Sequence, residues 1–282
     1  MIDQPRLPSL RLPPGSCDAH CHIFGPFDRY PLPEHRSFTP PLAPETRLRA
    51  LHDRFGFARC VLVQSLGHGF DHRPLLDALR TGTGRYRGVA LVRPNDPDEQ
   101  IAAFAAAGVC GARVHLLAHL GGRPDLDTIR GVAARIKPFG WHLAIHLSGN
   151  DIVELAQFIR SLDVAVVIDH MARPDLAAGP AGPAMAALRG LIDGGRVWVK
   201  LSGADRLSRT GAPFHDALPI ARSIAAHAPE RVVWGSDWPH VNLHAATPDD
   251  VDLVDLIASV VPDEVHRRRL LVDNPGALFG FD

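Results

Sequence analysis

Short apolar runs alternate with amphipathic segments along most of the chain. The runs have the length of strands, are rich in Val, Ile and Leu, and are apolar almost throughout, which is typical of strands buried on both faces of a parallel sheet. We expect strands at residues 17–22, 58–64, 86–92, 110–116, 142–147, 165–170, 197–202 and 231–236. The segments between them predict helices at 44–55, 71–79, 96–107, 126–137, 151–162, 183–192, 213–228 and 248–260.

This succession of eight strand–helix units favours an α/β fold with a single (β/α)8 TIM barrel over a doubly wound sheet. No G-x-G-x-x-G motif follows an expected strand, so a dinucleotide fingerprint is absent. Residues 1–16, rich in Pro and Leu, predict an extended arm, and the proline-rich residues 24–44 predict a long loop. Loops of this length are often functional. We expect residues 1–282 to form one domain.

Composition and charge narrow the class of protein. The chain has 282 residues, is 46% hydrophobic, and carries 30 Lys and Arg against 31 Asp and Glu. This balance provides no field that attracts nucleic acid or an anionic membrane. We find neither an export signal nor a membrane span, so we expect a cytoplasmic protein whose oligomeric state stays open. The four cysteines, Cys17, Cys21, Cys60 and Cys110, are expected to be small buried residues.

Histidine is the unusual component, with 16 in the chain. In a barrel of this type, reactive groups gather at the carboxyl ends of the strands. His20 and His22 end the first expected strand, and their spacing puts both imidazoles on one face. The other candidates that end strands are His146, His170 and Asp237. Because the first and last strands of a closed barrel are neighbours, we expect Asp237 beside His20 and His22 in one catalytic site. His52, His227 and His266 fall on outer helices and are expected to face solvent.

Basic side chains interrupt the apolar strands. Arg113 lies in the middle of the fourth expected strand, where a guanidinium must be paired. Either it forms an internal salt bridge, or it clamps a substrate carboxylate through two parallel hydrogen bonds. Arg206 follows the seventh strand and should reach the same end of the barrel. His68 follows the second strand, where it either lines the same wall or has only a local role in its loop. Lys200 predicts a structural ion pair, with a Schiff-base role as the alternative.

Several of these motifs together resemble the amidohydrolase superfamily: the H-x-H of His20 and His22, Asp169-His170, Lys200-Leu201-Ser202-Gly203, and Trp-Gly-Ser-Asp-Trp-Pro-His at residues 234–240. The branch they resemble is that of 2-pyrone-4,6-dicarboxylate hydrolase and related lactonases, from about Asp18 to Asn274-Pro275. The resemblance implies a barrel that hydrolyses a lactone, with Arg113 and Arg206 holding the substrate's carboxylates.

Three positions depart from that branch. His119 stands where it carries an arginine, which makes His119 a further candidate for substrate binding. Phe38 and His146 stand where it tends to carry tyrosines. The changes at His119 and Phe38 favour a related lactone with fewer or differently placed carboxylates, such as a sugar-acid lactone, over the pyrone dicarboxylate.

The resemblance leaves a metal cofactor open. The 2-pyrone-4,6-dicarboxylate hydrolases work without metal, whereas other branches hold one zinc ion. The corresponding ligands would be His20, His22, His146 and Asp237, with an open position for water. With one divalent ion, most simply zinc, the bound water would ionise near neutral pH. Without it, His20, His22 and His170 would polarise the carbonyl as hydrogen-bond donors. Asp237 is the expected general base in both versions.

The main functional hypothesis is therefore a hydrolase that opens a lactone carrying at least one carboxylate, a small anionic substrate. One alternative is a metal-dependent decarboxylase of the same superfamily, acting on an aromatic or enoic acid. The other is a non-catalytic barrel that binds an acidic metabolite, although the complete set of strand-end residues argues against it.

Overall fold

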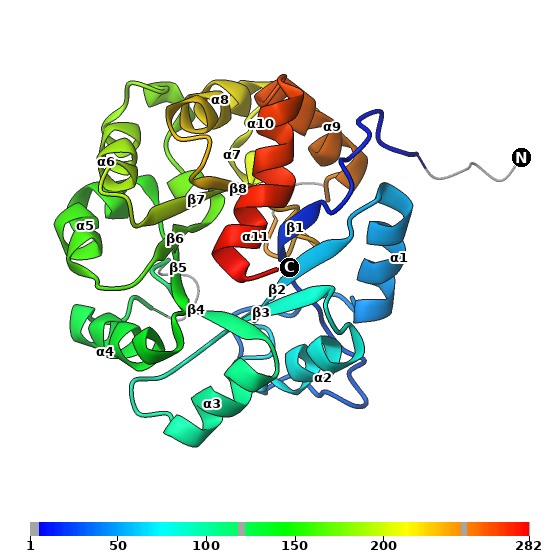
Figure 1. Cartoon of the computed structure of the whole chain (residues 1–282), viewed down its shortest axis with the longest axis vertical. Coiled ribbons are helices and arrows are strands. Elements are labelled where there is room, and N and C mark those ends of the chain that lie inside the picture. Colours follow the sequence, from blue (N-terminus) through cyan, green and yellow to red (C-terminus); the bar gives the residue numbers. More distant parts are fainter. Residues whose placement is uncertain (1–5, 118–121, 244–246, 282) are drawn as a thin grey trace, which may run out of the picture.

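Eight parallel strands form the centre of the computed structural model, which describes residues 6–117, 122–243 and 247–281. In these residues the sheet runs in the order β1 to β8, each strand paired with the next. The strands are β1 Cys17–Cys21, β2 Arg59–Val63, β3 Tyr86–Ala90, β4 Val109–His115, β5 His142–His146, β6 Val166–Ile168, β7 Val197–Leu201 and β8 Val232–Trp234. The predicted (β/α)8 barrel is confirmed (Figure 1).

Contacts between the first strand and the segment after the last strand close the barrel. Cys21 forms an isolated parallel bridge with Trp238. The His22 N–H donates to the Trp238 carbonyl at 2.8 Å, and the Asp237 N–H donates to the His20 carbonyl at 2.8 Å. This closure brings Asp237 beside His20 and His22, as neighbouring strands in a closed barrel require.

Helices surround the barrel (Figure 1). They are α1 Glu45–Phe55, α2 Arg73–Thr81, α3 Asp98–Ala106, α4 Leu126–Ile136, α5 Gly149–Ser161, α6 Pro183–Ile192, α7 Ala204–Leu207, α8 Leu218–His227, α9 Asp250–Val260, α10 Glu264–Arg268 and α11 Asn274–Phe279. The helix predicted from residue 213 begins later because Phe214 has a φ of 63°, outside the helical region. Among the described residues, no helix is both long and apolar enough to cross a membrane.

The barrel interior is filled at the amino-terminal ends of the strands. Cys17, Ala19 and Val61 pack there with Phe279 and Phe281 from the end of the chain. The Phe279 ring lies 5.4 Å from the ring of His142, the first residue of β5. Helix α11 therefore covers this end of the barrel (Figure 1). A larger apolar layer packs between the strands and the outer helices.

Two strands depart from regular geometry near the ends that the sequence predicted. The β1–β2 register shifts between Asp18 and Cys21, a bulge that adds one residue to β1. The Asp18 carboxylate fills the bulge, because Oδ1 accepts hydrogen bonds from the His20 N–H at 3.2 Å and the Ser236 N–H at 2.9 Å. Strand β6 stops at Ile168, two residues early, and the chain then turns through residues 170–173 with φ values of 51°, 55°, 61° and 46°.

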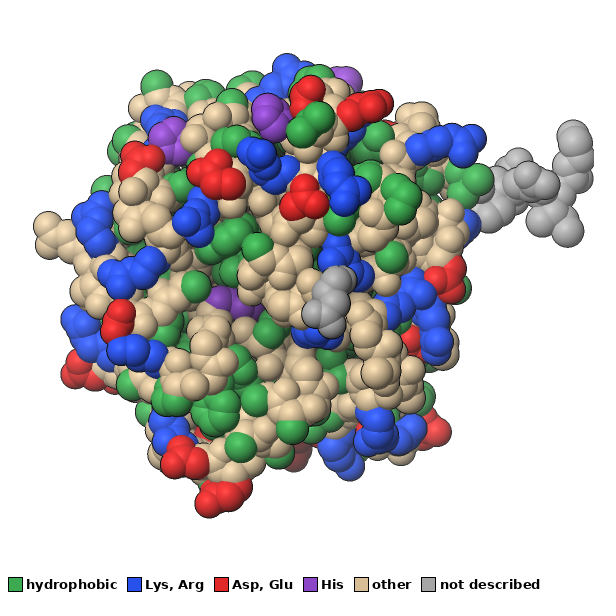
Figure 2. All heavy atoms as spheres, in the orientation of Figure 1, with side chains coloured by type: hydrophobic (Ala, Val, Ile, Leu, Met, Phe, Trp, Pro, Cys, Tyr) green, Lys and Arg blue, Asp and Glu red, His purple; other side chains and the backbone are tan. Residues whose placement is uncertain are grey.

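The two long irregular segments lie against the barrel. In the described part of the N-terminal arm, the Leu10 N–H donates to Asp255 of α9 at 2.9 Å. The loop at 24–44 is closed at its base by Phe24 and Ala43, whose backbones exchange hydrogen bonds of 2.8 and 2.9 Å. Basic and acidic side chains are interspersed over the face seen in Figure 2, in keeping with the balanced charge.

Candidate active site

A cavity of about 320 Å³ opens at the carboxyl ends of the strands. Its charged lining is Arg113, Arg173, Arg206 and Asp237, and its imidazole lining is His22, His115, His146 and His170. Ser37 and Phe38 from the loop at 24–44 form part of the wall. The volume and the convergent polar groups are typical of a small-molecule site.

Asp237 is the buried carboxylate of this site, 1% exposed. Its Oδ1 lies 3.3 Å from Nε2 of His22 and 3.6 Å from Nε2 of His20. Its Oδ2 lies 2.5 Å from Nε of Arg206 and 3.8 Å from Nε2 of His170. Burial alone would raise the pKa of this carboxyl, but the Arg206 guanidinium and the imidazoles hold it well below its usual range. Asp237 is therefore ionised and able to accept a proton.

Each imidazole around Asp237 has a second anchor. His22 donates from Nδ1 to the Val63 carbonyl at 2.7 Å, and His170 Nδ1 lies 2.9 Å from the Ser202 hydroxyl. The His20 ring lies between those of His22 and His170, at 5.0 and 4.8 Å. Burial lowers the pKa of His170 to about 3, so this ring is neutral. The structure thus brings together all four residues predicted to be catalytic.

A second buried carboxylate, Asp169, lies deeper in the barrel. Its Oδ2 accepts a hydrogen bond from Nε of Arg113 at 2.8 Å, and its Oδ1 lies 3.3 Å from Nζ of Lys200 and 3.4 Å from Nδ1 of His20. Burial alone would raise the pKa of Asp169, but Lys200 and Arg113 hold it well below its usual range. Arg113 thus forms the internal ion pair and also lines the cavity. Lys200 forms the ion pair expected of it.

The two other arginines of the cavity differ in their partners. Arg206 bonds Asp237 through Nε and donates from a terminal nitrogen to the Val241 carbonyl at 2.9 Å. Arg173 reaches the cavity from the turn that follows β6, and its guanidinium forms no hydrogen bond or ion pair with the described residues. Sequence reasoning assigned Arg173 no role. The sequence feature that could have identified Arg173 is its position, five residues after the end of the short apolar strand β6.

His146 and His115 form another part of the cavity wall and are paired across β4 and β5. Neither ring has a hydrogen-bond partner among the described residues. Burial and the nearby Arg113 hold the pKa of both imidazoles well below the usual value, so they are neutral.

The described residues contain two groups of possible metal donors at this end of the barrel. One is His20, His22 and Asp237, and the other is His20, Asp169 and His170. His146 belongs to neither group, so it does not join the other three predicted ligands. Its ring instead lies against His170, at 4.9 Å.

One predicted substrate-binding residue falls elsewhere. His68 is buried but is not part of the described cavity lining. Its Nε2 accepts a hydrogen bond from the Gly25 N–H at 3.2 Å, and its ring stacks on Phe24 at 5.9 Å. Of the two roles left open for His68, the structure favours the one in a loop, because this side chain supports the base of the loop at 24–44. His119 lies outside the described residues.

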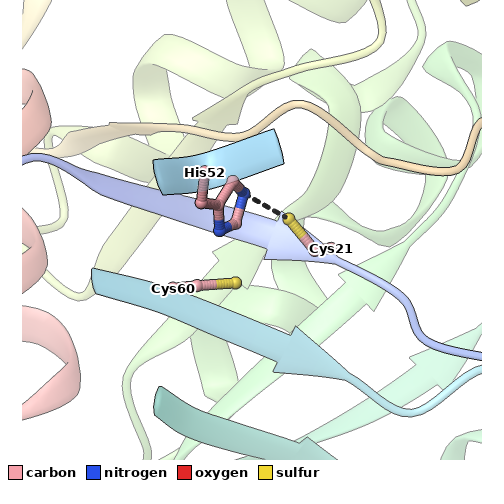
Figure 3. Close-up of side chains that lie close together, drawn as sticks. All are labelled: Cys21, His52 and Cys60. Carbon is pink, nitrogen blue, oxygen red and sulfur yellow. Dashed lines mark hydrogen bonds between the residues drawn. The ribbon is translucent and has the colours of Figure 1, made fainter. Parts of the chain in front are cut away.

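His52 is also wrongly predicted: it is 1% exposed, whereas His227 and His266 are exposed as expected. Its Nε2 lies 3.2 Å from Oδ2 of Asp18 and 3.7 Å from Sγ of Cys21. Figure 3 shows the ring reaching from α1 towards Cys21 on β1, with Cys60 on β2 nearby. Burial alone would lower the pKa of His52, but the hydrogen bond to Asp18 raises it to about 9. The imidazolium therefore anchors the carboxylate that fills the β1 bulge.

The fold and the site define a barrel enzyme with a buried, ionised carboxylate at the carboxyl ends of its strands. Residues 17–281 match the family model described as Amidohydrolase, and the chain belongs to this family. It is 39% identical to the 2-pyrone-4,6-dicarboxylate hydrolase of Comamonas testosteroni, over 98% of this chain and 93% of that protein. It is 36% identical to the 4-sulfomuconolactone hydrolase of Hydrogenophaga intermedia, over 95% and 90%. The predicted family is confirmed.

The solved structures agree with this assignment. The crystal structure of Agrobacterium tumefaciens ATU3138, an apo structure, superposes with a TM-score of 0.87. The two chains are 32% identical, and the match covers 98% of this chain and 99% of that one. The correspondence therefore extends over the whole barrel.

Proposed function

We propose that the protein hydrolyses a small anionic lactone, with Asp237 activating the attacking water. The observation that carries the proposal is an ionised, buried carboxylate in contact with three imidazoles at the base of a cavity lined by arginines. Hydrolases similar to this chain are named for cyclic esters that carry acidic groups, which supports this reaction over decarboxylation.

The arginines of the cavity wall select the charge of the substrate. Burial and repulsion from Arg206 both lower the pKa of Arg173, so an anion bound between the two guanidiniums relieves that repulsion. Guanidiniums bind carboxylates through parallel, charge-assisted hydrogen bonds. Arg113 already donates its Nε to Asp169, and only its terminal nitrogens remain for a substrate. The balanced overall charge gives no long-range attraction, so these local cations supply the selectivity.

The reaction follows from the positions of the remaining groups. Asp237 takes a proton from water, and the oxygen attacks the lactone carbonyl carbon. Imidazole N–H groups of His20 and His170 donate to the oxyanion of the tetrahedral intermediate. When that intermediate collapses, the ring C–O bond breaks and Asp237 returns its proton to the leaving oxygen. The product is the open-chain hydroxy acid or its keto tautomer.

We infer that this reaction uses no metal ion. Three buried cations, Lys200, Arg113 and Arg206, already accompany two carboxylates, Asp169 and Asp237. Three positive and two negative charges give this group a net charge of about +1. A divalent ion would raise the net charge to about +3, and unpaired charge in a buried site costs much free energy. Arg206 also occupies one oxygen of Asp237. The residues present therefore do not fit the metal, and the histidines act as hydrogen-bond donors.

An Asp237→Asn variant tests the function. We expect kcat on carboxylated lactones to fall by about 10²–10⁴-fold, because general base catalysis contributes that much. Binding of the lactone, measured by calorimetry, should persist. Asp175→Asn, an exposed carboxylate at the same end of the barrel, is the matched control and should retain full turnover. Equal rates for Asp237→Asn and wild type would exclude Asp237 as the base. Release of carbon dioxide without lactone consumption would identify a decarboxylase instead.

A further inference from the structure

Lys200 is the most deeply placed cation of the barrel and one of only two lysines in the chain. It lies on β7, fully buried at 0% exposure. Its Nζ is 3.0 Å from Nδ1 of His20 and 3.3 Å from Oδ1 of Asp169. Arg113 bonds the other oxygen of Asp169. Lys200 therefore lies between the second carboxylate and the back of the His20 ring, and the proposed reaction gives it no role.

The contact with His20 fixes the direction of a hydrogen bond. An ammonium group donates and has no acceptor. Nδ1 of His20 must then be the acceptor, since its other polar neighbour, Oδ1 of Asp169 at 3.4 Å, forms no hydrogen bond among the described residues. The single proton of a neutral imidazole must therefore lie on Nε2. That nitrogen lies 3.6 Å from Oδ1 of Asp237 and has no hydrogen-bond partner among the described residues. Burial and Lys200 hold the pKa of His20 well below its usual value, in keeping with a neutral ring.

This tautomer is the opposite of the one that a metal requires. A histidine ligand offers a lone pair from one nitrogen and normally donates the proton of the other to a carboxylate or carbonyl. Ligation through Nε2 would require a proton on Nδ1, directed at the Lys200 ammonium 3.0 Å away. His22 meets the requirement for a ligand, since its Nδ1 donates to the Val63 carbonyl and its Nε2 faces Asp237. His20 is thus the member of the group that Lys200 removes from ligation.

We propose that Lys200 is a positioning residue that holds His20 in the Nε2–H tautomer, which makes His20 a hydrogen-bond donor and keeps a divalent cation out of the group formed by His20, His22 and Asp237. The use of that donor to stabilise an oxyanion rests on the proposed function. The tautomer and the exclusion of metal do not, and both are measurable without any substrate.

The tautomer is tested directly on the wild-type protein. In ¹⁵N–¹H correlation spectra of the imidazole rings, an unprotonated nitrogen resonates far downfield of a protonated one. The signals of His20 are assigned by their loss in a His20→Asn variant. We expect an unprotonated Nδ1 and a protonated Nε2. A protonated Nδ1 at neutral pH overturns the proposal, and this measurement decides it even if substitutions of Lys200 do not fold.

The exclusion of metal is tested by zinc binding to metal-stripped protein. We expect Lys200→Met to bind one Zn²⁺ about 10- to 100-fold more tightly than wild type, the range over which groups behind a ligand change metal affinity. Adding His22→Asn to Lys200→Met should remove the gain. Lys137→Met, which removes a half-exposed lysine paired with Asp163, is the matched control and should bind zinc as wild type does. Equal affinity of wild type and folded Lys200→Met for zinc overturns the proposal. Failure of lactone hydrolysis would contradict the proposed function and leave both of these results unaffected.

Discussion

In the proposed reaction, Arg206 acts through the basicity of Asp237. Its guanidinium lies 2.5 Å from the carboxylate and is a main reason that the pKa of this group lies well below its usual range. A carboxylate that a cation keeps ionised can accept a proton over a wide pH range, but it is a weak base. A substrate anion that draws the guanidinium towards itself makes the carboxylate a stronger base. In the proposed reaction, the same side chain thus binds the substrate and sets the basicity of Asp237.

This coupling predicts a pH dependence. Because the pKa of Asp237 is lowered, the base stays active as the pH falls, and the acid limb of kcat/KM should lie below the ordinary carboxyl range. Arg206→Gln removes the cation, so the pKa of Asp237 rises and the acid limb moves to higher pH. The measurement is kcat/KM against pH for both proteins. A limb that stays in place would contradict the control of Asp237 by Arg206.

Arg173 is suited to a test of charge selectivity, because its guanidinium forms no hydrogen bond or ion pair with the described residues and the fold does not depend on it. Arg173→Met should raise KM for an anionic lactone by about 10- to 100-fold, since hydrogen bonds to charged groups contribute about 1.5–3 kcal/mol. Turnover at saturation should change far less. Arg209→Met, which removes an exposed arginine paired with Asp175, is the control and should keep the wild-type KM. An unchanged KM in Arg173→Met would exclude this residue from substrate binding.

At the scale of single residues, the sequence predicts which side chains share a site better than it predicts their contacts, for a physical reason. Spacing along a strand tells which side chains share a face, and this was enough to bring His20, His22 and Asp237 to one site. It does not tell which loop a side chain supports, and His68 turned out to hold Gly25. Nor does it give the partners of buried charges, so the contact between Lys200 and His20 was not foreseen.

Among the elements, β1 is the one whose side-chain directions at the site depend on contacts outside the cavity, those of Asp18 with the backbone and with His52. A bulge in a strand re-aims the side chains that follow it. Here the bulge after Asp18 lets Ala19 pack inside the barrel while His20 also contacts interior groups. Helix α1 supplies the support, since its His52 holds the carboxylate of Asp18. The sequence pattern predicted both elements and almost the right ends, but a bulge has no signature in hydrophobic periodicity.

The anchoring of α1 on β1 predicts a pH-dependent stability. In the folded protein the pKa of His52 is about 9, against about 6.5 when unfolded. The stabilisation is therefore complete below pH 6.5 and is lost as the pH rises through 9. At about 1.4 kcal/mol per pKa unit, it amounts to about 3 kcal/mol. Urea unfolding of wild type and His52→Gln from pH 6 to 9.5 measures it as the difference between the two proteins. A difference that does not depend on pH would refute the ion pair.

At the scale of the whole molecule, the two ends of the barrel differ: the polar groups of the candidate site lie at one end, and the other end is packed with apolar side chains. The cavity, Asp169 and Asp237 lie where the strands end, as is usual in this fold. The opposite end is closed by α11 and the residues after it, with Phe279 and Phe281 packed inside the strands. The count of eight strand–helix units predicted the barrel. Helix α11 was not predicted, because six residues containing Pro and Gly show no helical periodicity.

This division predicts a substitution that affects stability alone. Phe279 is 2% exposed and packs on His142 at the end of the barrel away from the cavity. Phe279→Ala should lower the free energy of unfolding by about 3–5 kcal/mol, because it removes a large buried ring and leaves a cavity. At a temperature where the variant is folded, its kcat and KM should equal those of wild type, since none of the lining residues has changed. Val265→Ala, at a site 67% exposed, should change neither quantity. Denaturant unfolding and steady-state kinetics on the same samples measure the free energy of unfolding, kcat and KM of each protein. A large loss of kcat in folded Phe279→Ala would mean that the two ends of the barrel are coupled.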